Sequence, residues 1–213
     1  SSDVCSSDLM LGRGPMVLVV HPSVPAKTVK ELIAVARAKP GQLNYTSSGI
    51  GGINHLGVEV FRSMAKIDIV HVPYKGMTPA ITDLMAGQVQ LLITTFPSIG
   101  QQIGTGRVRA IAVTSPKRSR FAPELPSVIE AGIPGYEVQI WWGLFAPANV
   151  PRPVVDRLNR EMRAMQETAD IREKLGREGA EAVPTTPEEF RSMLETSIAR
   201  WRKVIKDGNL KLD

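Results

Sequence analysis

From Val17 onward, short apolar runs rich in β-branched residues alternate with segments of helical periodicity. The strand-like runs are VLVV, LNYTSS, IDIVHVP, VQLLITT, VRAIAVT and VQIWWGLFAP, and a helical segment follows each of the first four. This alternation is typical of an α/β fold, in which helices cover a sheet. The sequence therefore predicts the α/β class.

The helical segments carry local start and stop signals. Thr28 followed by Glu31 forms a capping box before a helix that ends near Pro40. Thr78 and Pro79 predict an N-cap followed by proline at the first helical position. Further helices are expected at about 53–64 and 97–104, with a short one near 127–131.

The character of the sequence changes near Val154, where charged amphipathic segments begin. We expect helices at about 153–167, 170–177 and 187–206, with the short strand GAEAVP between the last two. Residues 16–140 are thus expected to form one compact lobe. Residues 141–213 are expected to form a strand followed by helices that need another surface to cover.

The first residues differ from the rest of the chain. SSDVCSSDL has no periodicity, and DVCSSDL is also what one reading frame of a common sequencing-library adaptor would encode. We therefore expect residues 1–15 to be a disordered or artefactual leader. The segment has neither the basic region nor the apolar region of a signal peptide.

Composition argues against several classes of protein. The longest apolar runs are strand-sized, shorter than the roughly 18 residues that a membrane span needs, so no membrane-spanning helix is expected. The charge of +5 comes from 26 Lys and Arg interspersed with 21 Asp and Glu, and only 5% of residues are aromatic. No nucleic-acid partner is expected from this pattern. The single cysteine cannot form an internal disulfide.

A glycine-rich turn follows the strand LNYTSS. The hydroxyl groups of Thr46, Ser47 and Ser48 precede Gly49 and Gly51 at the start of the next helix. Free backbone N–H groups at a helix start bind anions, and glycine allows a ligand to approach the backbone. The turn therefore predicts a carboxylate or phosphate site. The alternative is a strand-to-helix turn that binds nothing.

Two further turns come at strand ends. Tyr74, Lys75 and Gly76 follow IDIVHVP, and Thr95 follows VQLLI. Ligands of open α/β sheets bind at the carboxyl ends of the strands, so these turns are expected to face the same crevice as the glycine-rich turn. Alternatively, Lys75 is a solvated charge and Tyr74 a packing residue.

No known catalytic or metal motif is present. The turn is not a P-loop, because no Gly-Lys-Ser/Thr follows, and Asn54 stands where a dinucleotide fingerprint needs its third glycine. Ser48 lacks the G-x-S-x-G elbow, and His55 and His71 lack metal-ligand spacing. We expect both histidines to be structural or hydrogen-bonding residues, with no metal, no cofactor and no enzyme activity.

Five separated motifs together resemble one protein family. They are NYTSSGIGGINHLGVEVF, IDIVHVPYKGMTPAITDLMAGQVQLL, VRAIAVTSPKRSRFAPELPSVIEAGIPGYEV, WWGLFAPANVPRPVVDRLNREM and GAEAVPTTPEEF. In this order they resemble the substrate-binding proteins of tripartite tricarboxylate transporters, also called Bug receptors.

The resemblance implies a type II periplasmic-binding-protein fold with two α/β lobes that close on a small carboxylate. It implies a periplasmic, monomeric receptor that delivers its ligand to membrane permease subunits. Matching positions make the expected ligand-binding set Ser47, Ser48, Gly49, Gly51, His55, Tyr74, Lys75, Gly76 and Thr95. The family binds acids largely through backbone amides, hydroxyls and water.

The chain also departs from the family. The family's first strand and its proline- and glycine-rich loop do not precede Val17, so we expect one complete second lobe (16–140) plus the hinge strand and C-terminal helices (141–213) of a mostly missing first lobe. VLVV and WWGLFAP would be the hinge crossings, and this chain alone would bind acids poorly. The alternatives are the ligand-sensing domain of a transcription regulator and, less favoured, an enzyme that acts on a small acid.

Overall fold

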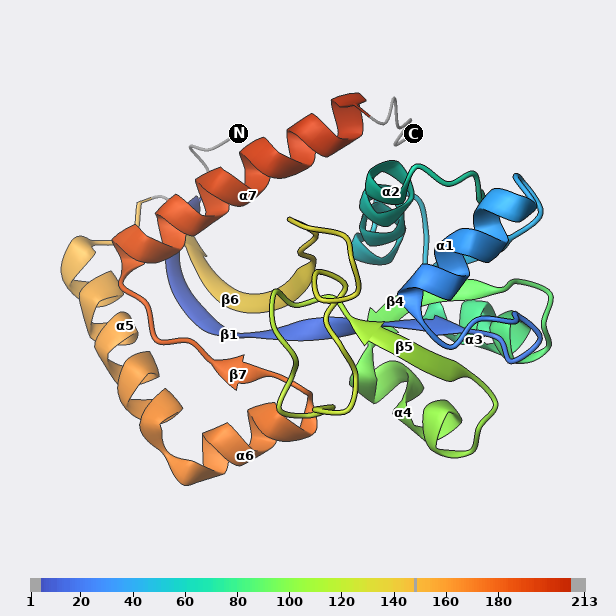
Figure 1. The fold of residues 1–213 in the computed structure, drawn as a ribbon. Coiled ribbons are helices and arrows are strands. Elements are labelled where there is room, and N and C mark those ends of the chain that lie inside the picture. Colours follow the sequence, from blue (N-terminus) through green and yellow to red (C-terminus); the bar gives the residue numbers. More distant parts are fainter. Residues whose placement is uncertain (1–4, 148, 208–213) are drawn as a thin grey trace. The chain divides into compact units, whose positions relative to one another are not determined.

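The computed structural model describes residues 5–147 and 149–207. The α/β class is confirmed, and the chain divides into two compact units (Figure 1). Unit 1 contains the chain up to Gly14 and Ile140–Lys203, and unit 2 contains Pro15–Gln139 together with the chain from Val204 onward.

Unit 2 is built on a sheet in the order β3-β2-β4-β1-β5. The strands are β1 (Cys5–Val20), β2 (Asn44–Ser47), β3 (Val70–Pro73), β4 (Leu91–Thr95) and β5 (Arg109–Val113). β2 is parallel to β3 and β4, whereas β1 is antiparallel to β4 and β5. β2, β3, β4 and β5 therefore all end at the same edge of the sheet.

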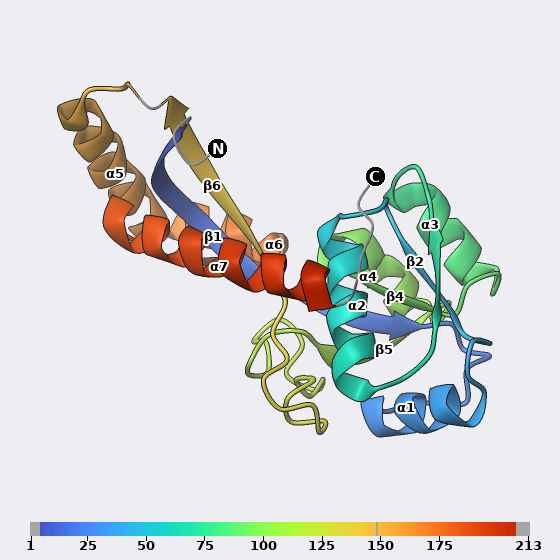
Figure 2. The ribbon, with the colours of Figure 1, turned by 90° about the horizontal axis from the view of Figure 1, so that it is seen from above.

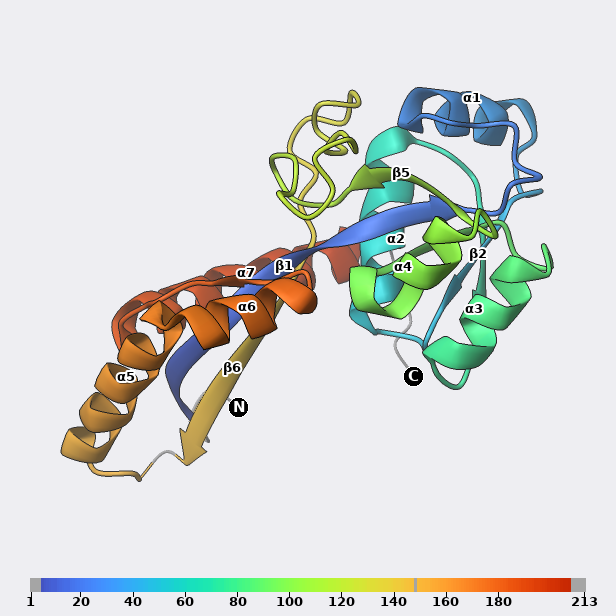
Figure 3. The same cartoon turned by 90° about the horizontal axis from the view of Figure 1, so that it is seen from below.

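Four helices cover this sheet: α1 (Val29–Ala38), α2 (Ile53–Ala65), α3 (Met77–Met85) and α4 (Phe96–Gly104). α1 and α2 lie on one face, and α3 and α4 lie together on the other (Figures 1 and 3). The second face has a buried core in which Val17 and Leu92 pack with Leu84 and Ile99. The face covered by α3 and α4 is thus closed by apolar contacts.

Two local expectations are wrong. α3 begins at Met77 rather than after Thr78, because Gly76 takes the N-cap position with a φ of 123° that suits glycine. No helix forms near 127–131. The segment makes a single turn in which Ala131 N donates to Ser127 O (3.0 Å), and Gly132 ends it with a φ of 108°.

The first strand begins earlier than the sequence suggested. β1 runs from Cys5, so the structure places a strand where a leader without structure was expected. Leu9 and Met10 are buried, and Gly12 pairs with Ala182. Pairing in unit 1 therefore orders a segment that has no alternating hydrophobic pattern of its own.

Unit 1 contains the first part of β1, most of β6 (Gln139–Pro147), β7 (Glu181–Ala182), α5 (Arg152–Glu167), α6 (Ala169–Arg177) and most of α7 (Pro187–Asp207) (Figure 2). Both β6 and β7 pair with β1. Phe190 of α7 packs on Trp141 of β6, and the Gln166 side chain of α5 donates to Met10 O (2.7 Å). These contacts attach the helices to the strands.

Candidate functional site

Three helices begin at the carboxyl edge of the unit 2 sheet. α2, α3 and α4 follow β2, β3 and β4, and their N-cap residues are Gly52, Gly76 and Thr95. Within the described range, none of these N-caps makes a side-chain capping hydrogen bond. Their first-turn N–H groups therefore give this edge a positive electrostatic character that suits an anion.

The turn between β2 and α2, residues 48–52, is called the glycine loop below. Gly49 and Gly51 have φ values of 150° and 77°, which residues other than glycine rarely adopt. The Ser47 hydroxyl donates to Gly49 O (3.0 Å) and lies 3.3 Å from Gly49 N. The Ser47 side chain therefore fixes the backbone of the loop at Gly49.

The β3–α3 turn is hydrogen-bonded to the glycine loop. Tyr74 N donates to Ser47 O and Gly76 N donates to Ser48 O, both at 3.1 Å. The two turns that the sequence predicted as candidate sites thus lie side by side.

Asn54, in the first turn of α2, ties the helix to the sheet. Its Nδ2 donates to Ile93 O (2.7 Å) and its Oδ1 accepts from the Ser48 hydroxyl (3.2 Å). In a dinucleotide fingerprint a glycine would stand at this position, and it would make neither of these side-chain bonds. Asn54 is therefore a structural anchor.

Three aromatic rings stack behind the glycine loop, and we call them the histidine stack. His71 lies 4.7 Å from Tyr45 and 4.1 Å from His55 between ring centroids, with interplanar angles of 15° and 13°. His71 Nε2 is 2.7 Å from Ser47 Oγ, and His55 Nδ1 accepts from Gly51 N (3.1 Å). Both imidazoles therefore contact groups that shape the loop.

A buried carboxylate anchors the other side of the histidine stack. Glu59 Oε1 accepts from the Tyr45 hydroxyl (2.5 Å), and Glu59 Oε2 pairs with Arg62 (2.6 Å). Burial lowers the pKa of His71 to about 4, with His55 adding to the effect and Glu59 opposing it. Burial also lowers the pKa of His55. Both rings are therefore neutral at neutral pH.

The remaining predicted residues differ in their surroundings. The Tyr74 hydroxyl donates to Asp83 (2.5 Å), and this bond, with some burial, raises its pKa to about 12. Lys75 is exposed. The Thr95 hydroxyl pairs with Ser98 (2.9 Å). His55 is 5% exposed, so its ring lies beneath the glycine loop. Direct contact of these residues with a ligand stays a prediction.

Sequence reasoning missed the carboxylate network of Tyr45, Glu59 and Arg62. One signal was available: Glu59 interrupts the apolar run GVEVF in the middle of α2, and it is 6% exposed. A carboxylate on a buried helix face needs a partner. Its spacing of four residues from His55 also puts both on one face of the helix.

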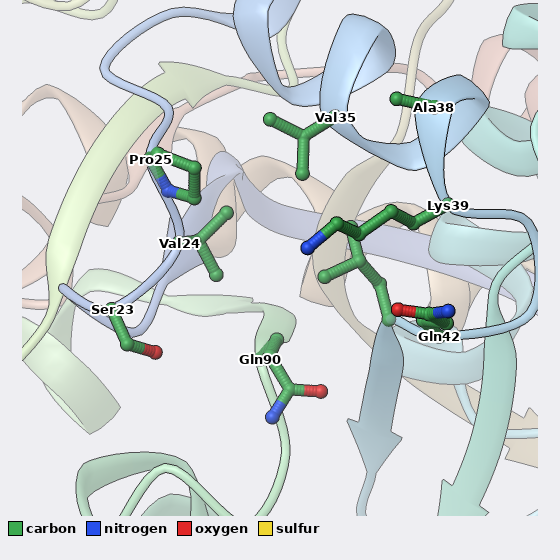
Figure 4. Close-up of a pocket in the computed structure, with 9 residues that line it drawn as sticks. Ser23, Val24, Pro25, Val35, Ala38, Lys39, Gln42 and Gln90 are labelled. Atoms are coloured by element: carbon green, nitrogen blue, oxygen red, sulfur yellow. The ribbon is translucent and has the colours of Figure 1, made fainter.

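A hollow of about 290 Å³ lies at the opposite edge of the sheet, by the amino ends of β2 and β4 (Figure 4). It is lined mainly by apolar side chains, among them Val24, Pro25, Val35 and Leu43. Gln90 reaches it, but its amide already accepts from Asn44 N and donates to Gly87 O, both at 2.9 Å. Its lining includes none of the predicted site residues.

In the described part of the chain, no three His, Cys, Asp or Glu side chains are grouped so that they could hold a metal ion. None of the helices there combines the length and apolar composition that crossing a membrane requires.

Comparison with known proteins gives a consistent family. The tripartite tricarboxylate transporter family receptor matches residues 7–210. The UPF0065 protein in the tcbD-tcbE intergenic region of Pseudomonas sp. (strain P51) is 38% identical over 197 residues, which cover 92% of this chain and 59% of that protein. The chain thus spans about three fifths of the length of this curated relative.

Two solved structures share the fold. R. palustris Rpa4515 with adipate has a TM-score of 0.89 at 35% identity over 98% of this chain and 70% of that one. MatC (Rpa3494) from Rhodopseudomonas palustris with bound malate has a TM-score of 0.81 at 26% identity over 94% and 69%. The type II periplasmic-binding-protein fold expected from the sequence is confirmed. The chain belongs to the receptors of the tripartite tricarboxylate transporter family.

Proposed function

We propose that the chain is the anion-binding part of a periplasmic, monomeric receptor that captures a small dicarboxylate without transforming it. The receptor then delivers the acid to the permease subunits of its transporter. Residues 16–140 would be its second lobe, and residues 141–213 the hinge strand and C-terminal helices of its first lobe.

The observation that carries this proposal is the row of three uncapped helix starts at one sheet edge. α2, α3 and α4 present backbone donors there, and the glycine loop leaves room for a ligand to approach them. One carboxylate group would be bound by the other amides of the glycine loop, together with the Ser48 hydroxyl after it turns away from Asn54 Oδ1. Lys75, exposed in the neighbouring turn, supplies a cation.

The ligand class rests on the related structures. One is bound to adipate and the other to malate, and both are small dicarboxylates. The neutral donors of the loop suit a carboxylate. Among the described residues, the buried carboxylate behind the loop, Glu59, is already paired with Tyr45 and Arg62.

Isothermal titration calorimetry of the full-length protein tests the proposal, with adipate and malate as probes at pH 7.5. We expect one of these acids to bind and Gly51→Ala to weaken binding by about five- to thirtyfold, because a side chain at a φ of 77° costs about 1–2 kcal/mol.

Ser23→Ala is the matched control, since Ser23 lies at the opposite edge of the sheet and should leave affinity unchanged. Absence of binding to any small dicarboxylate would contradict the ligand class. Equal affinity of Gly51→Ala and the wild type would contradict the location. Two adjacent permease-like reading frames in the genome are the expected mark of the transport role.

A further inference from the structure

The hydrogen bond from Gly51 N to His55 Nδ1 determines the state of the His55 ring. A backbone amide can only donate, so Nδ1 must carry a lone pair, and the neutral ring must carry its proton on Nε2. Gly51 has a φ of 77° and lies at the centre of the turn that joins β2 to α2. A neutral imidazole therefore holds the backbone of Gly51 in the glycine loop.

Among residues 5–147 and 149–207, the charged or titratable groups that act on His55 belong to the network already described. On α2 itself, Glu59 favours a proton on the ring and Arg62 opposes it. From β2 and β3 come the Tyr45 and His71 rings, and His71 stacks at 4.1 Å. Burial disfavours the cation, and two stacked imidazolium rings would repel each other.

Protonation of His55 would turn its acceptor into a donor. The new Nδ1–H would point at Gly51 N–H, so the hydrogen bond would be lost and two donors would face each other. His71 differs, because the Ser47 hydroxyl already donates to Gly49 O, so His71 Nε2 is the donor to Ser47 Oγ and a second proton would go to Nδ1. Acid would thus act on the glycine loop through His55.

We propose that His55 is a positioning residue: its unprotonated ring holds the glycine loop in the shape that binds the acid, and protonation of the ring releases the acid. This inference rests on the proposed function. The expected loss of affinity on protonation is the opposite of what charge attraction alone would cause, because an imidazolium near a bound carboxylate would strengthen binding.

The test is the pH dependence of adipate or malate affinity in the full-length protein, between pH 7.5 and 4.5. Below the midpoint of the His55 titration, wild-type affinity should fall by up to about tenfold per pH unit beyond the fall caused by protonation of the acid itself. The variant His55→Asn isolates this effect, because its side-chain oxygen can accept from Gly51 N but does not titrate in this range.

We expect His55→Asn to bind within about threefold of the wild type at pH 7.5 and to have the shallower pH profile. His55→Leu, which has no acceptor, should lose affinity at every pH. His21→Asn is the control, since His21 pairs with Ser23 far from the loop and should keep the wild-type profile. Parallel profiles of the wild type and His55→Asn, or tighter wild-type binding in acid, would overturn the proposal.

A second measurement needs no ligand. The ¹⁵N shifts of the His55 ring should show the Nε2–H tautomer at pH 7.5, and the Gly51 amide should shift with the His55 midpoint in the wild type alone. A proton on Nδ1 at pH 7.5, or a Gly51 amide that does not follow His55, would overturn the proposal. Failure of both acids to bind would instead count against the ligand class.

Discussion

At the scale of single residues, the site depends on where protons lie. Tyr45, His71 and His55 form one stack in this order. Glu59 bonds to the Tyr45 end, Ser47 contacts the central His71, and Gly51 N donates to the His55 end. Each polar atom in these contacts has a defined partner, which is what burial requires.

His71 makes the stability of the protein depend on pH. Its pKa is about 4 in the folded state and about 6.5 when unfolded, so the unfolded state binds more protons between these values. The free energy of unfolding should therefore fall as the pH falls from about 6.5 to 4, by about 1–2 kcal/mol after allowance for partial exposure.

Urea unfolding at pH 7 and at pH 4.5 measures this slope. In His71→Gln, whose side chain can still bond to Ser47 Oγ, part of the slope should disappear. An unchanged slope in this variant would show that other groups cause it.

Two tyrosines allow the stability contribution of a buried hydrogen bond to be compared with that of a partly exposed one. Both hydroxyls donate to a carboxylate at 2.5 Å, but Tyr45 is fully buried whereas Tyr74 is only half-buried. Tyr45→Phe should lower the free energy of unfolding by about 1–3 kcal/mol, because it leaves a buried carboxylate oxygen without this donor. Tyr74→Phe should cost less than about 1 kcal/mol. Urea denaturation of both variants makes the comparison, and equal losses would contradict it.

At the scale of elements, the sequence predicted most helices and strands because their patterns are local. Half of the capping box of α1 is present: Glu31 N donates to Thr28 Oγ1 (3.2 Å), whereas the Glu31 carboxylate accepts from Lys27 N (2.6 Å). The first part of β1 escaped prediction because non-local pairing orders it. The stacking of His71 on His55 could not be predicted for the same reason, since β3 and α2 meet only in the folded sheet.

Two helical glycines should respond in opposite ways to alanine. A Cβ at Gly100 of α4 would meet open space, whereas one at Gly57 of α2 would lie 3.3 Å from a Val138 methyl group. Gly100→Ala should raise the free energy of unfolding by up to about 1 kcal/mol, because alanine restricts the unfolded chain. Gly57→Ala should gain less or lose stability. Chemical denaturation decides, and a loss in Gly100→Ala would refute this reading of α4.

At the scale of the whole molecule, the two units have unequal cores. In the described part of unit 1, the buried apolar side chains are Leu9, Met10, Val155, Leu175, Ala180 and Phe190, while unit 2 buries many more. Leu144 and Phe145 are 55% and 46% exposed. As neighbours on β6 they point to opposite faces, so both faces are partly uncovered there.

Hydrogen exchange should therefore be faster in α5–α7 than in β2 and β4, because fewer buried contacts oppose local opening. The chain spans about three fifths of the length of its curated relative. We therefore expect the backbone amides of unit 1 to exchange more slowly in the full-length protein than in this chain alone. Equal protection of both units in this chain would contradict the difference in their cores.

The backbone bonds between the glycine loop and the β3–α3 turn also matter for changing specificity. Ser47 and Ser48 accept these bonds through main-chain oxygens, so the frame does not depend on the side chains of Ile50 and Lys75, both exposed. A directed-evolution library confined to these two positions would vary the surface offered to an acid while the scaffold beneath stays constant.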